Sequence, residues 1–223
     1  MCGRYNLTIG ADSLQDFYDT LGGGFYKMSG PRYNIAPGQA VPVVVMHEGQ
    51  RVLKSMHWGF IPHWAKDKNV GYKMINARSE TAHTKPAFRV AIRKSRCLIP
   101  ATGWYEWQKR ADGTKQPFNI HLPHDTPFAM AGLWTHWQPE GGDPIHSCTI
   151  LTTSAVKALS GLHERMPVIL KPDYRAKWLD PNNTHADDLL QLMQNTETNY
   201  MAYAVSTMVN KPANDGPECV EPI

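Results

Sequence analysis

Cysteine is scarce in this sequence, and positive and negative charges nearly balance. The four cysteines lie far apart, at positions 2, 97, 148 and 219, with no C-x-x-C pair. This spacing excludes the usual zinc motifs and a disulfide framework, so we expect reduced thiols and a cytoplasmic location. Lysine and arginine number 23 against 20 acidic residues, a net charge of +3. Such a mild excess does not by itself indicate nucleic-acid binding, although one local groove can still be strongly basic.

Long apolar runs, repeats and low-complexity linkers are also missing. No apolar stretch is long enough to span a membrane, and the residues after Met1 lack the basic and apolar regions of a signal peptide. We therefore expect an intracellular protein with no membrane segment. A chain of 223 residues can bury one large core. Because no linker divides it, residues 1–223 are expected to form a single domain.

Short runs rich in β-branched and aromatic residues dominate the pattern and predict strands. They cover residues 41–47, 51–58, 96–100, 103–108, 117–122, 127–137, 145–153 and 167–170. Helical spacing is rarer and occurs at 12–21, 86–95, 154–162, 172–179 and 186–194, with Asp12 or Ser13 capping the first and Ser154 the third. Consecutive strands with helices inserted at a few points favour an α+β fold, mainly antiparallel β with peripheral helices.

Cys2 becomes the first residue if Met1 is excised, as is usual before a small second residue. Its α-amine would then have a pKa of about 7.7 to 8.0 and its thiol a pKa of about 8.5, so both would be partly nucleophilic at neutral pH. An amine and a thiol on neighbouring carbons condense with an aldehyde, first to an imine and then to a five-membered thiazolidine. Position alone, however, fits a cysteine at a frayed terminus better.

The motif TGWYEW, residues 102–107, places a carboxyl group between tryptophans. In a strand, Trp104 and Glu106 point to one face, and Tyr105 and Trp107 point to the other. Partial desolvation by aromatic neighbours is expected to raise the pKa of Glu106, which suits proton transfer near neutral pH. For an isolated glutamate, a rim position beside ordinary core aromatics is the more common case.

The motif MINARSE, residues 74–80, carries three polar side chains at alternate positions. An extended backbone would place Asn76, Arg78 and Glu80 on one face. There the amide offers hydrogen bonds in both directions, and the guanidinium offers a fork that fits a phosphate. The same pattern also fits a surface strand with a salt bridge.

The motif HERMPVIL puts His163 and Arg165 directly before an apolar strand. A histidine there can exchange protons at physiological pH, although most of the 10 histidines must have ordinary roles. The two histidines of HLPH, residues 121–124, lack carboxylate or thiolate companions nearby, so we do not expect a metal site there. We expect neither a metal nor another cofactor.

Several longer motifs occur from one end of the chain to the other. They are MCGRY (1–5), PRYNIAPGQ (31–39), WGFIPHWAK (58–66), INARSET (75–81), KPAFR (85–89), RCLIPATGWYEW (96–107), HERMPVIL (163–170) and VSTMVNKPANDGPE (205–218). In sequence and order they resemble the SRAP family, the SOS-response-associated peptidases. The resemblance implies a barrel-like α+β fold and a DNA-damage-response protein that attaches itself to abasic sites in single-stranded DNA. It also implies that "peptidase" refers at least partly to removal of the protein's own Met1.

The resemblance further implies catalytic roles for four residues. Cys2 would form the thiazolidine with the aldehyde of the opened deoxyribose. Asn76 would hold Cys2 and the sugar by hydrogen bonds, and Glu106 would shuttle protons during ring opening and imine formation. His163 would protonate or stabilise the sugar oxygen. A lyase activity through the imine is a further implied activity.

The resemblance also implies a DNA groove. Its members are three arginines for the phosphates and three apolar residues for the flanking bases: Arg4, Arg78, Arg165, Pro37, Trp64 and Trp107. Because Glu106 and Trp107 alternate along a strand, having both at one site would require a bulge or a strand end. We expect a monomer that contacts abasic single-stranded DNA and no membrane, and that lies on the nucleoid when bound. Partners at replication forks remain open.

Two alternative functions use the same residues differently. The first is a cysteine hydrolase that cleaves peptides or amides in trans, with Cys2 as nucleophile and His163 as base. The second is a non-covalent reader of nucleic acid in which Cys2 is incidental. This second hypothesis predicts salt-sensitive binding that survives alkylation of Cys2 and is equally strong with and without the lesion.

Overall fold

The computed structural model describes residues 2–18 and 30–223. The strands are β1 (Tyr5–Leu7), β2 (Arg32–Ile35), β3 (Ala40–His47), β4 (Gln50–Trp58), β5 (Asn76–Arg78), β6 (Arg96–Ala101), β7 (Gly103–Lys109), β8 (Lys115–His121), β9 (Phe128–Trp137), β10 (Ile145–Ser154), β11 (Arg165–Pro167), β12 (Ile169–Leu170) and β13 (Met201–Ala204). The α-helices are α1 (Ala11–Tyr18), α2 (Ala91–Lys94), α3 (Pro172–Leu179) and α4 (Ala186–Gln194). Short 3-10 helices are η1 (Lys68–Lys73), η2 (Pro123–Asp125), η3 (Lys157–Leu159), η4 (Thr207–Asn210) and η5 (Pro217–Cys219).

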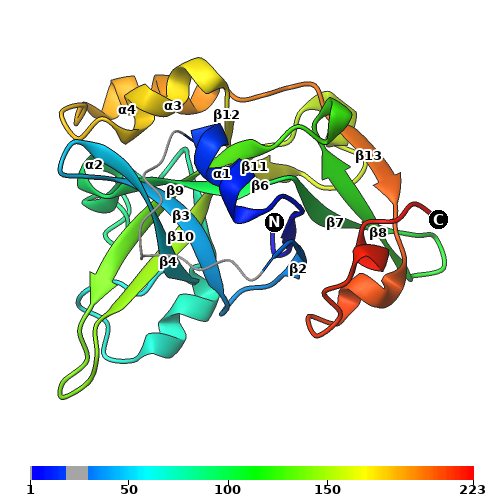
Figure 1. The fold of residues 1–223 in the computed structure, drawn as a ribbon, viewed down its shortest axis with the longest axis horizontal. Coiled ribbons are helices and arrows are strands. Elements are labelled where there is room, and N and C mark those ends of the chain that lie inside the picture. The colour runs from blue at the N-terminus through cyan, green and yellow to red at the C-terminus, as the bar shows by residue number, and fades with distance from the viewer. Residues whose placement is uncertain (1, 19–29) are drawn as a thin grey trace.

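Strands β10, β4, β3, β6 and β9 form a closed ring, because each pairs with the next and β9 pairs with β10 again. All of these pairings are antiparallel except that of β10 with β4. Figure 1 shows the ring with α3 and α4 lying together along one side. Closure removes the exposed sheet edges that an open sheet would present. The predicted barrel-like α+β fold with peripheral helices is confirmed.

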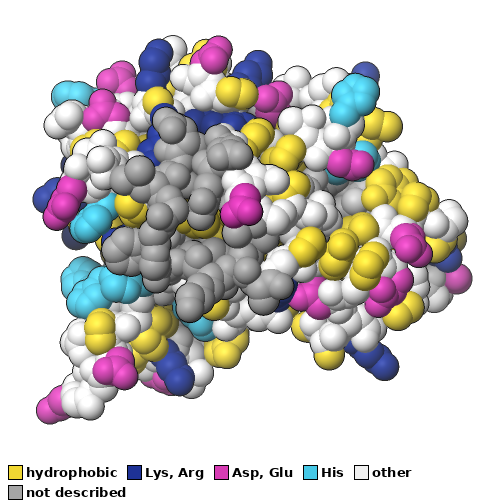
Figure 2. All heavy atoms as spheres, viewed as in Figure 1, with side chains coloured by type: hydrophobic (Ala, Val, Ile, Leu, Met, Phe, Trp, Pro, Cys, Tyr) yellow, Lys and Arg dark blue, Asp and Glu magenta, His cyan; other side chains and the backbone are white. Residues whose placement is uncertain are grey.

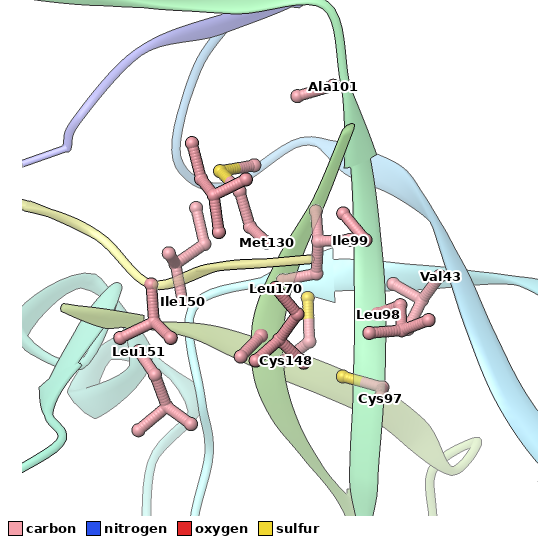
Figure 3. Packing of buried hydrophobic residues seen from close by; sticks show 14 of the residues in the cluster. Val43, Cys97, Leu98, Ile99, Ala101, Met130, Cys148, Ile150, Leu151 and Leu170 are labelled. Carbon is pink, nitrogen blue, oxygen red and sulfur yellow. The ribbon is translucent and has the colours of Figure 1, made fainter. Parts of the chain in front are cut away.

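The barrel strands are apolar on both faces. Val43, Val44 and Val45 of β3 are all buried, although successive side chains point to opposite sides. Figure 3 shows side chains from the barrel strands packing together, among them Leu98 of β6 and Met130 of β9. Burying such a side chain contributes roughly 1.5 to 3 kcal/mol. The run of β-branched residues therefore specifies a strand with both faces covered.

A second sheet holds the beginning of the chain. Its strand order is β13-β8-β7-β1-β2, so β1 is paired on both sides. Strands β7 and β8 form a hairpin closed by the turn at residues 110–114. Gly103 at the start of β7 faces Asn6 and Asn119, and a Cβ there would lie 2.6 Å from Asn119 Oδ1. A larger residue would therefore force the side chains of Asn119 and Asn6 to shift.

The predicted helices are matched in part. Those at 172–179 and 186–194 coincide with α3 and α4. The predicted helix at 86–95 is mostly a series of turns, and only α2 is α-helical. For the predicted helix at 12–21, α1 begins at Ala11, so Asp12 and Ser13 lie inside it and do not cap it, and residues 19–21 lie outside the described residues.

The predicted helix at 154–162 is wrong. Ser154 ends β10 and pairs with Arg165 of β11, so it does not cap a helix. Only η3 forms in this stretch, and its N-cap is Val156. Pairing between strands therefore overrides the local helical pattern. The predicted strand at 167–170 is split between β11 and β12.

The last residues pack against the second sheet. Val205, Val209 and Cys219 form a small buried cluster with Tyr105 of β7. Near the end of the chain lie η5 and a bridge between Val205 and Pro222. Figure 2 shows hydrophobic side chains gathered on the part of this face where Figure 1 places β13 and the C-terminus. Among the described residues, no helix has the length and apolarity needed to cross a membrane.

Candidate active site and nucleic-acid interface

Cys2 is buried and held in place. Its side chain and backbone have no exposed surface, and its carbonyl oxygen accepts a hydrogen bond of 2.8 Å from Asn76 Nδ2. Three residues later the chain enters β1, which is paired on both sides. The frayed-terminus interpretation is therefore wrong for Cys2.

Asn76 begins β5, which runs parallel to β10 with Asn76 opposite Ile150. The amide nitrogen of Asn76 is used by the carbonyl of Cys2, whereas its Oδ1 is buried and has no hydrogen-bond partner within the described ranges. A buried acceptor left without a partner costs about 1 to 3 kcal/mol. Asn76 therefore offers an acceptor beside Cys2 that a bound molecule can satisfy.

Glu106 lies on β7 with 3% of its surface exposed. Burial raises the pKa of its carboxyl group to about 7, which confirms the predicted direction. Burial also raises the pKa of the Cys2 thiol well above its usual range, and the nearby Glu106 carboxylate raises it further. In the chain that carries Met1 the thiol is therefore protonated at neutral pH, because it is removed from water. Glu106 is therefore close enough to Cys2 to influence the protonation of its thiol.

The side chains of Glu106 and Trp107 point to opposite faces of β7. Its pairing with β8 runs in continuous register from Gly103 to Lys109, so no bulge brings the two side chains to one face. Trp104 packs in the main core, whereas Trp107 packs with the cluster around Tyr105. The guanidinium of Arg4 lies 5.9 Å from the centre of the Trp107 ring. Trp107 therefore joins Arg4 on the other side of β7 from Glu106.

His163 lies in the loop that leads into β11. Its Nδ1 accepts a hydrogen bond of 2.9 Å from the backbone nitrogen of Arg165, so the neutral ring carries its proton on Nε2. Burial lowers the pKa of His163, which favours that neutral ring. Gln108 Nε2 donates to the carbonyl of Gly161 at 3.2 Å, which ties the same loop to β7. The fold therefore brings the His163 loop to the strand that carries Glu106.

Arg78 and Arg165 are brought together by β10. Thr152 of β10 lies opposite Arg78 of β5, and Ser154 lies opposite Arg165 of β11. Arg78 is exposed at the end of β5. Both outer nitrogens of Arg165 bond Glu80, at 2.7 and 2.9 Å.

Glu80 follows the end of β5, so the predicted extended face ends at Arg78. Its carboxylate is held by Arg165, which lowers the pKa of Glu80. The salt-bridge interpretation of MINARSE therefore applies to Glu80, while Asn76 lies at the Cys2 site. A phosphate that binds Arg165 must compete with this carboxylate.

Pro37 and Trp64 lie in loops that connect strands. Pro37 is partly exposed between β2 and β3, and Trp64 is 56% exposed after β4. The loop after β4 is anchored by Trp58, which packs on Tyr5 at 5.3 Å and donates a hydrogen bond to the carbonyl of Ile75 at 2.9 Å. No contact within the described part of the chain joins Pro37 or Trp64 directly to Cys2.

Several residues that support this site are not predicted by the residues around them. The position of Glu80 in MINARSE predicts only the face that it shares with Asn76, not its pairing with Arg165. Asn34 bonds Arg4 and Asn210 bonds Trp107. The motifs PRYNIAPGQ and VSTMVNKPANDGPE, in which these two asparagines lie, are the sequence signal for them. Among the residues that the structure describes, no group of three or more His, Cys, Asp or Glu is placed to hold a metal ion.

Comparison with known proteins connects this geometry to a family. The family model for SOS response associated peptidase (SRAP) matches residues 1–212. The chain is 41% identical over 225 residues to the abasic site processing protein YoqW of Bacillus subtilis, covering 99% of each. It is 33% identical over 267 residues to the abasic site processing protein HMCES of Gallus gallus, covering 100% of this chain and 78% of the relative.

Solved structures share the fold. A Bacteroides thetaiotaomicron protein superposes with a TM-score of 0.87 at 23% identity, over 100% of both chains. A phage-related protein of Bordetella bronchiseptica gives a TM-score of 0.71 at 30% identity, covering 92% of this chain and 95% of the other. With a family model that matches nearly the whole chain and relatives that align over its full length, this protein belongs to the SRAP family.

Proposed function

We propose that this SRAP protein processes abasic sites in single-stranded DNA by attaching itself to them covalently through Cys2. One observation carries the proposal: a buried cysteine is held by Asn76 beside a carboxyl group whose pKa is about 7. The names of the relatives, abasic site processing proteins, support the same substrate. An abasic site is a DNA lesion whose opened sugar presents an aldehyde because its base is missing.

The reaction begins with removal of Met1. Water hydrolyses the Met1–Cys2 peptide bond, which releases methionine and leaves a free α-amine on Cys2. This amine adds to C1′ of the opened deoxyribose, and the resulting carbinolamine loses water to give an imine. The Cys2 sulfur then adds to the imine carbon, and the thiol proton passes to the nitrogen. One aldehyde and one aminothiol thus give one thiazolidine and one water.

The surrounding residues suit these proton transfers. Glu106, with a pKa of about 7, can donate a proton to the departing hydroxyl and accept one from the thiol at neutral pH. With Glu106 as the proton acceptor, the thiol need not ionise on its own, so its raised pKa does not prevent the attack on the imine. His163, with its proton on Nε2, can donate a hydrogen bond to a sugar oxygen. The buried Oδ1 of Asn76 can accept a hydrogen bond from the new amine or the sugar.

The DNA strand would be held by charge and stacking. Phosphates would be bound by Arg4, Arg78 and Arg165, which concentrates the modest net charge where the backbone runs. Bases beside the lesion would pack against Pro37, Trp64 and Trp107, and each stack contributes about 1 to 3 kcal/mol without regard to sequence. We expect a monomer to suffice. A lyase activity through the imine is part of the same proposal.

A cysteine hydrolase acting in trans is the alternative from a different class. Such enzymes need a thiolate, and a nearby imidazolium stabilises it. Here the pKa of Cys2 is raised and that of His163 is lowered, and both directions oppose that ion pair. The crosslinking proposal is therefore favoured.

The test uses single-stranded DNA with one abasic site. Purified protein is incubated with it, and the adduct is measured on a denaturing gel and by intact mass. We expect an adduct with wild type and none with Cys2→Ala or with DNA that carries a tetrahydrofuran in place of the aldehyde sugar. An undiminished adduct from Cys2→Ala, or none from wild type, would contradict the proposal. Turnover of unrelated peptides by protein that lacks Met1 would support the hydrolase instead.

A further inference from the structure

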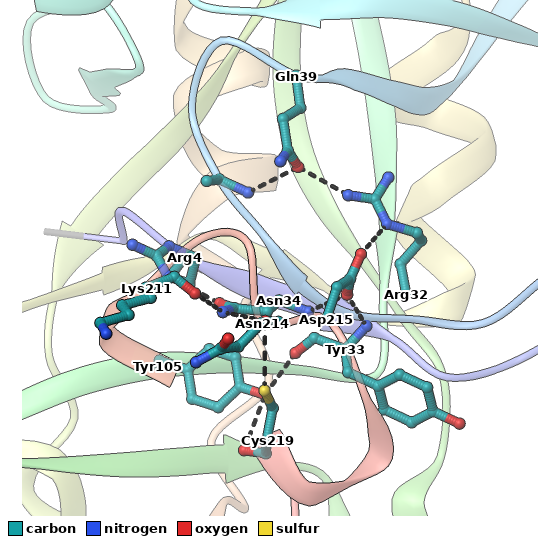
Figure 4. Close-up of polar contacts among 11 residues, drawn as sticks. Arg4, Arg32, Tyr33, Asn34, Gln39, Tyr105, Lys211, Asn214, Asp215 and Cys219 are labelled. Atoms are coloured by element: carbon teal, nitrogen blue, oxygen red, sulfur yellow. Dashed lines mark hydrogen bonds and ion pairs between the residues drawn. The ribbon is translucent and has the colours of Figure 1, made fainter. Parts of the chain in front are cut away.

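Two motifs that the proposed chemistry does not use meet in the structure. PRYNIAPGQ supplies β2 and the loop after it, and VSTMVNKPANDGPE supplies the segment Ser206–Cys219, called here the C-terminal segment. Figure 4 shows side chains of β2 and of this segment facing one another beside Arg4. The contact joins parts of the chain that are 175 to 183 positions apart in sequence. The role of this contact therefore has to be found in the side chains that it holds in place.

Asn34 is the centre of this contact and is fully buried. Its Nδ2 donates to the carbonyl oxygens of Val209, Lys211 and Asn214 at 3.1, 3.0 and 2.6 Å. Its Oδ1 accepts a hydrogen bond of 2.8 Å from Arg4 Nη1. Only an amide offers donors on one side and an acceptor on the other in so small a side chain. Asn34 thus ties the C-terminal segment to Arg4.

Arg4 is held by the C-terminal segment itself as well. Its Nη1 also donates to the carbonyl of Val209 at 2.6 Å. Because Nη1 is committed to the protein and Nε is buried, a phosphate is left to Nη2. A side chain with four rotatable bonds is in this way given one orientation before DNA arrives.

Trp107 is held by the same segment. Its indole Nε1 donates a hydrogen bond of 2.7 Å to Asn210 Oδ1, and the guanidinium of Arg4 lies over its ring. Asn210 is exposed, so this bond is not required to fill the core. Its effect is to set the plane of the ring on which a base would stack.

Asp215 fixes the C-terminal segment to β2. Its Oδ1 accepts from the backbone nitrogens of Tyr33 and Asn34 at 2.6 and 2.7 Å, and its Oδ2 pairs with Arg32 Nε. Arg32 in turn donates to Gln39 at 2.7 Å. The segment is therefore attached to the sheet independently of Arg4 and Trp107, so it can act as their support.

We propose that Asn34 and Asn210 are positioning residues for DNA binding, through which the C-terminal segment orients Arg4 for a phosphate and Trp107 for a base. This inference rests on the proposed function, because it takes Arg4 and Trp107 as DNA-contacting residues. It adds a role for two motifs and for residues that touch neither DNA nor the reacting atoms.

The test compares Asn34→Ala, Asn34→Asp and Asn210→Ala with Asn119→Ala. Asn119 is a matched control, because it is also buried and also uses both ends of its amide: its Oδ1 accepts from Asn6 and its Nδ2 donates to Tyr203. Binding is measured against single-stranded DNA carrying a tetrahydrofuran, which cannot crosslink, at a series of salt concentrations. Thermal unfolding reports whether each variant folds.

Asn34→Ala should weaken binding about tenfold and reduce the slope of log affinity against log salt by about 0.7, the value for one lost phosphate contact on a single strand. Asn34→Asp should behave in the same way, since its second oxygen faces three carbonyls and displaces the segment. Asn210→Ala should weaken binding about threefold with an unchanged slope, because a stacked ring carries no charge. With abasic DNA, the losses should appear in the concentration for half-maximal crosslinking, not in the saturated rate.

Asn210→Ala also keeps the inference testable if the Asn34 variants do not fold, because Asn210 is exposed. Trp107→Phe removes the hydrogen-bond partner of Asn210. In that variant, Asn210→Ala should cause no further loss of binding, as expected when two residues share one contact. Unchanged affinity in a folded Asn34→Ala, or equal losses in Asn119→Ala, would overturn the inference. If wild type binds the tetrahydrofuran strand but never crosslinks to an abasic one, the proposed chemistry fails while the salt slopes still decide the positioning role.

Discussion

The side-chain amide nitrogen of Asn76 donates a hydrogen bond of 2.8 Å to the backbone carbonyl oxygen of Cys2. This contact joins the start of the chain to β5, and β5 belongs to the barrel sheet through β10. The residue proposed as the nucleophile is therefore positioned by the barrel and by β1 at once. Its carbonyl oxygen is tied to β5, and three residues later the chain pairs with β7, the strand that carries Glu106.

Replacing Asn76 by alanine should slow crosslinking by about 10- to 100-fold, since one lost buried hydrogen bond costs about 1 to 3 kcal/mol. Asn76→Asp should be at least as slow, because a carboxylate oxygen would then face the carbonyl of Cys2. The measurement is the single-turnover rate on abasic DNA. Equal rates for wild type and Asn76→Asp would show that this bond does not position Cys2.

The rate of crosslinking should depend on the ionisation of Glu106. Its pKa of about 7 means that the acid form, which can expel water from the carbinolamine, is lost as pH rises above neutrality. At lower pH the α-amine of Cys2 is protonated and is no longer nucleophilic. The crosslinking rate plotted from about pH 5 to about pH 9 should therefore be bell-shaped. Glu106→Gln should lower the rate about 100-fold or more and remove the alkaline limb. An alkaline limb that persists in Glu106→Gln would assign it to another group.

Glu106 should also make the stability of the protein depend on pH. Burial raises its pKa from the usual 4.5 to about 7, so between these values the folded protein binds the proton and the unfolded chain does not. The stabilising contribution is complete below about pH 4.5 and is lost as pH rises through about 7. Relative to Glu106→Gln, the wild-type Tm should fall by about 6 to 12 °C over this window, since the shift corresponds to about 3 kcal/mol. If the Tm of the two proteins changes with pH in parallel, the raised pKa of Glu106 is refuted.

Removing the charge of Glu80 should strengthen DNA binding. Both outer nitrogens of Arg165 bond this carboxylate, which competes with a phosphate for the same donors. Glu80→Gln should raise the affinity for single-stranded DNA about threefold to tenfold at low salt, and less at high salt. Glu48→Gln, which makes the same charge change in the turn between β3 and β4, serves as the control. A gain of equal size in both variants would point to net charge alone.

A blocked amino terminus should abolish the adduct. The thiazolidine needs both the amine and the thiol of Cys2, so protein that retains Met1 or carries an uncleaved tag should bind abasic DNA without forming a stable crosslink. Intact mass before and after exposure to the DNA reports Met1 loss and adduct formation together. A stable adduct from tagged protein would disprove the thiazolidine.

Much of the fold can be predicted from local pattern. The apolar runs of β3 and β10, the turn after β7 and the helices α3 and α4 follow from side-chain periodicity and turn residues within each segment. The alternation of Glu106 and Trp107 along a strand follows from the pleat. These features depend on neighbours in sequence, so the sequence alone determines them. The four residues proposed for catalysis were instead indicated by the resemblance of their motifs to a family.

What only the tertiary structure decided depends on residues far apart in the chain. Ser154 is a strand residue because β11 pairs with it, and Arg165 has a competing carboxylate because β10 brings Glu80 to it. The thiol of Cys2 is protonated because the assembled core excludes water from it. Arg4 takes its orientation from Asn34 and from a carbonyl 205 positions away. Burial and long-range hydrogen bonds exist only once the chain has folded, so no local pattern contains them.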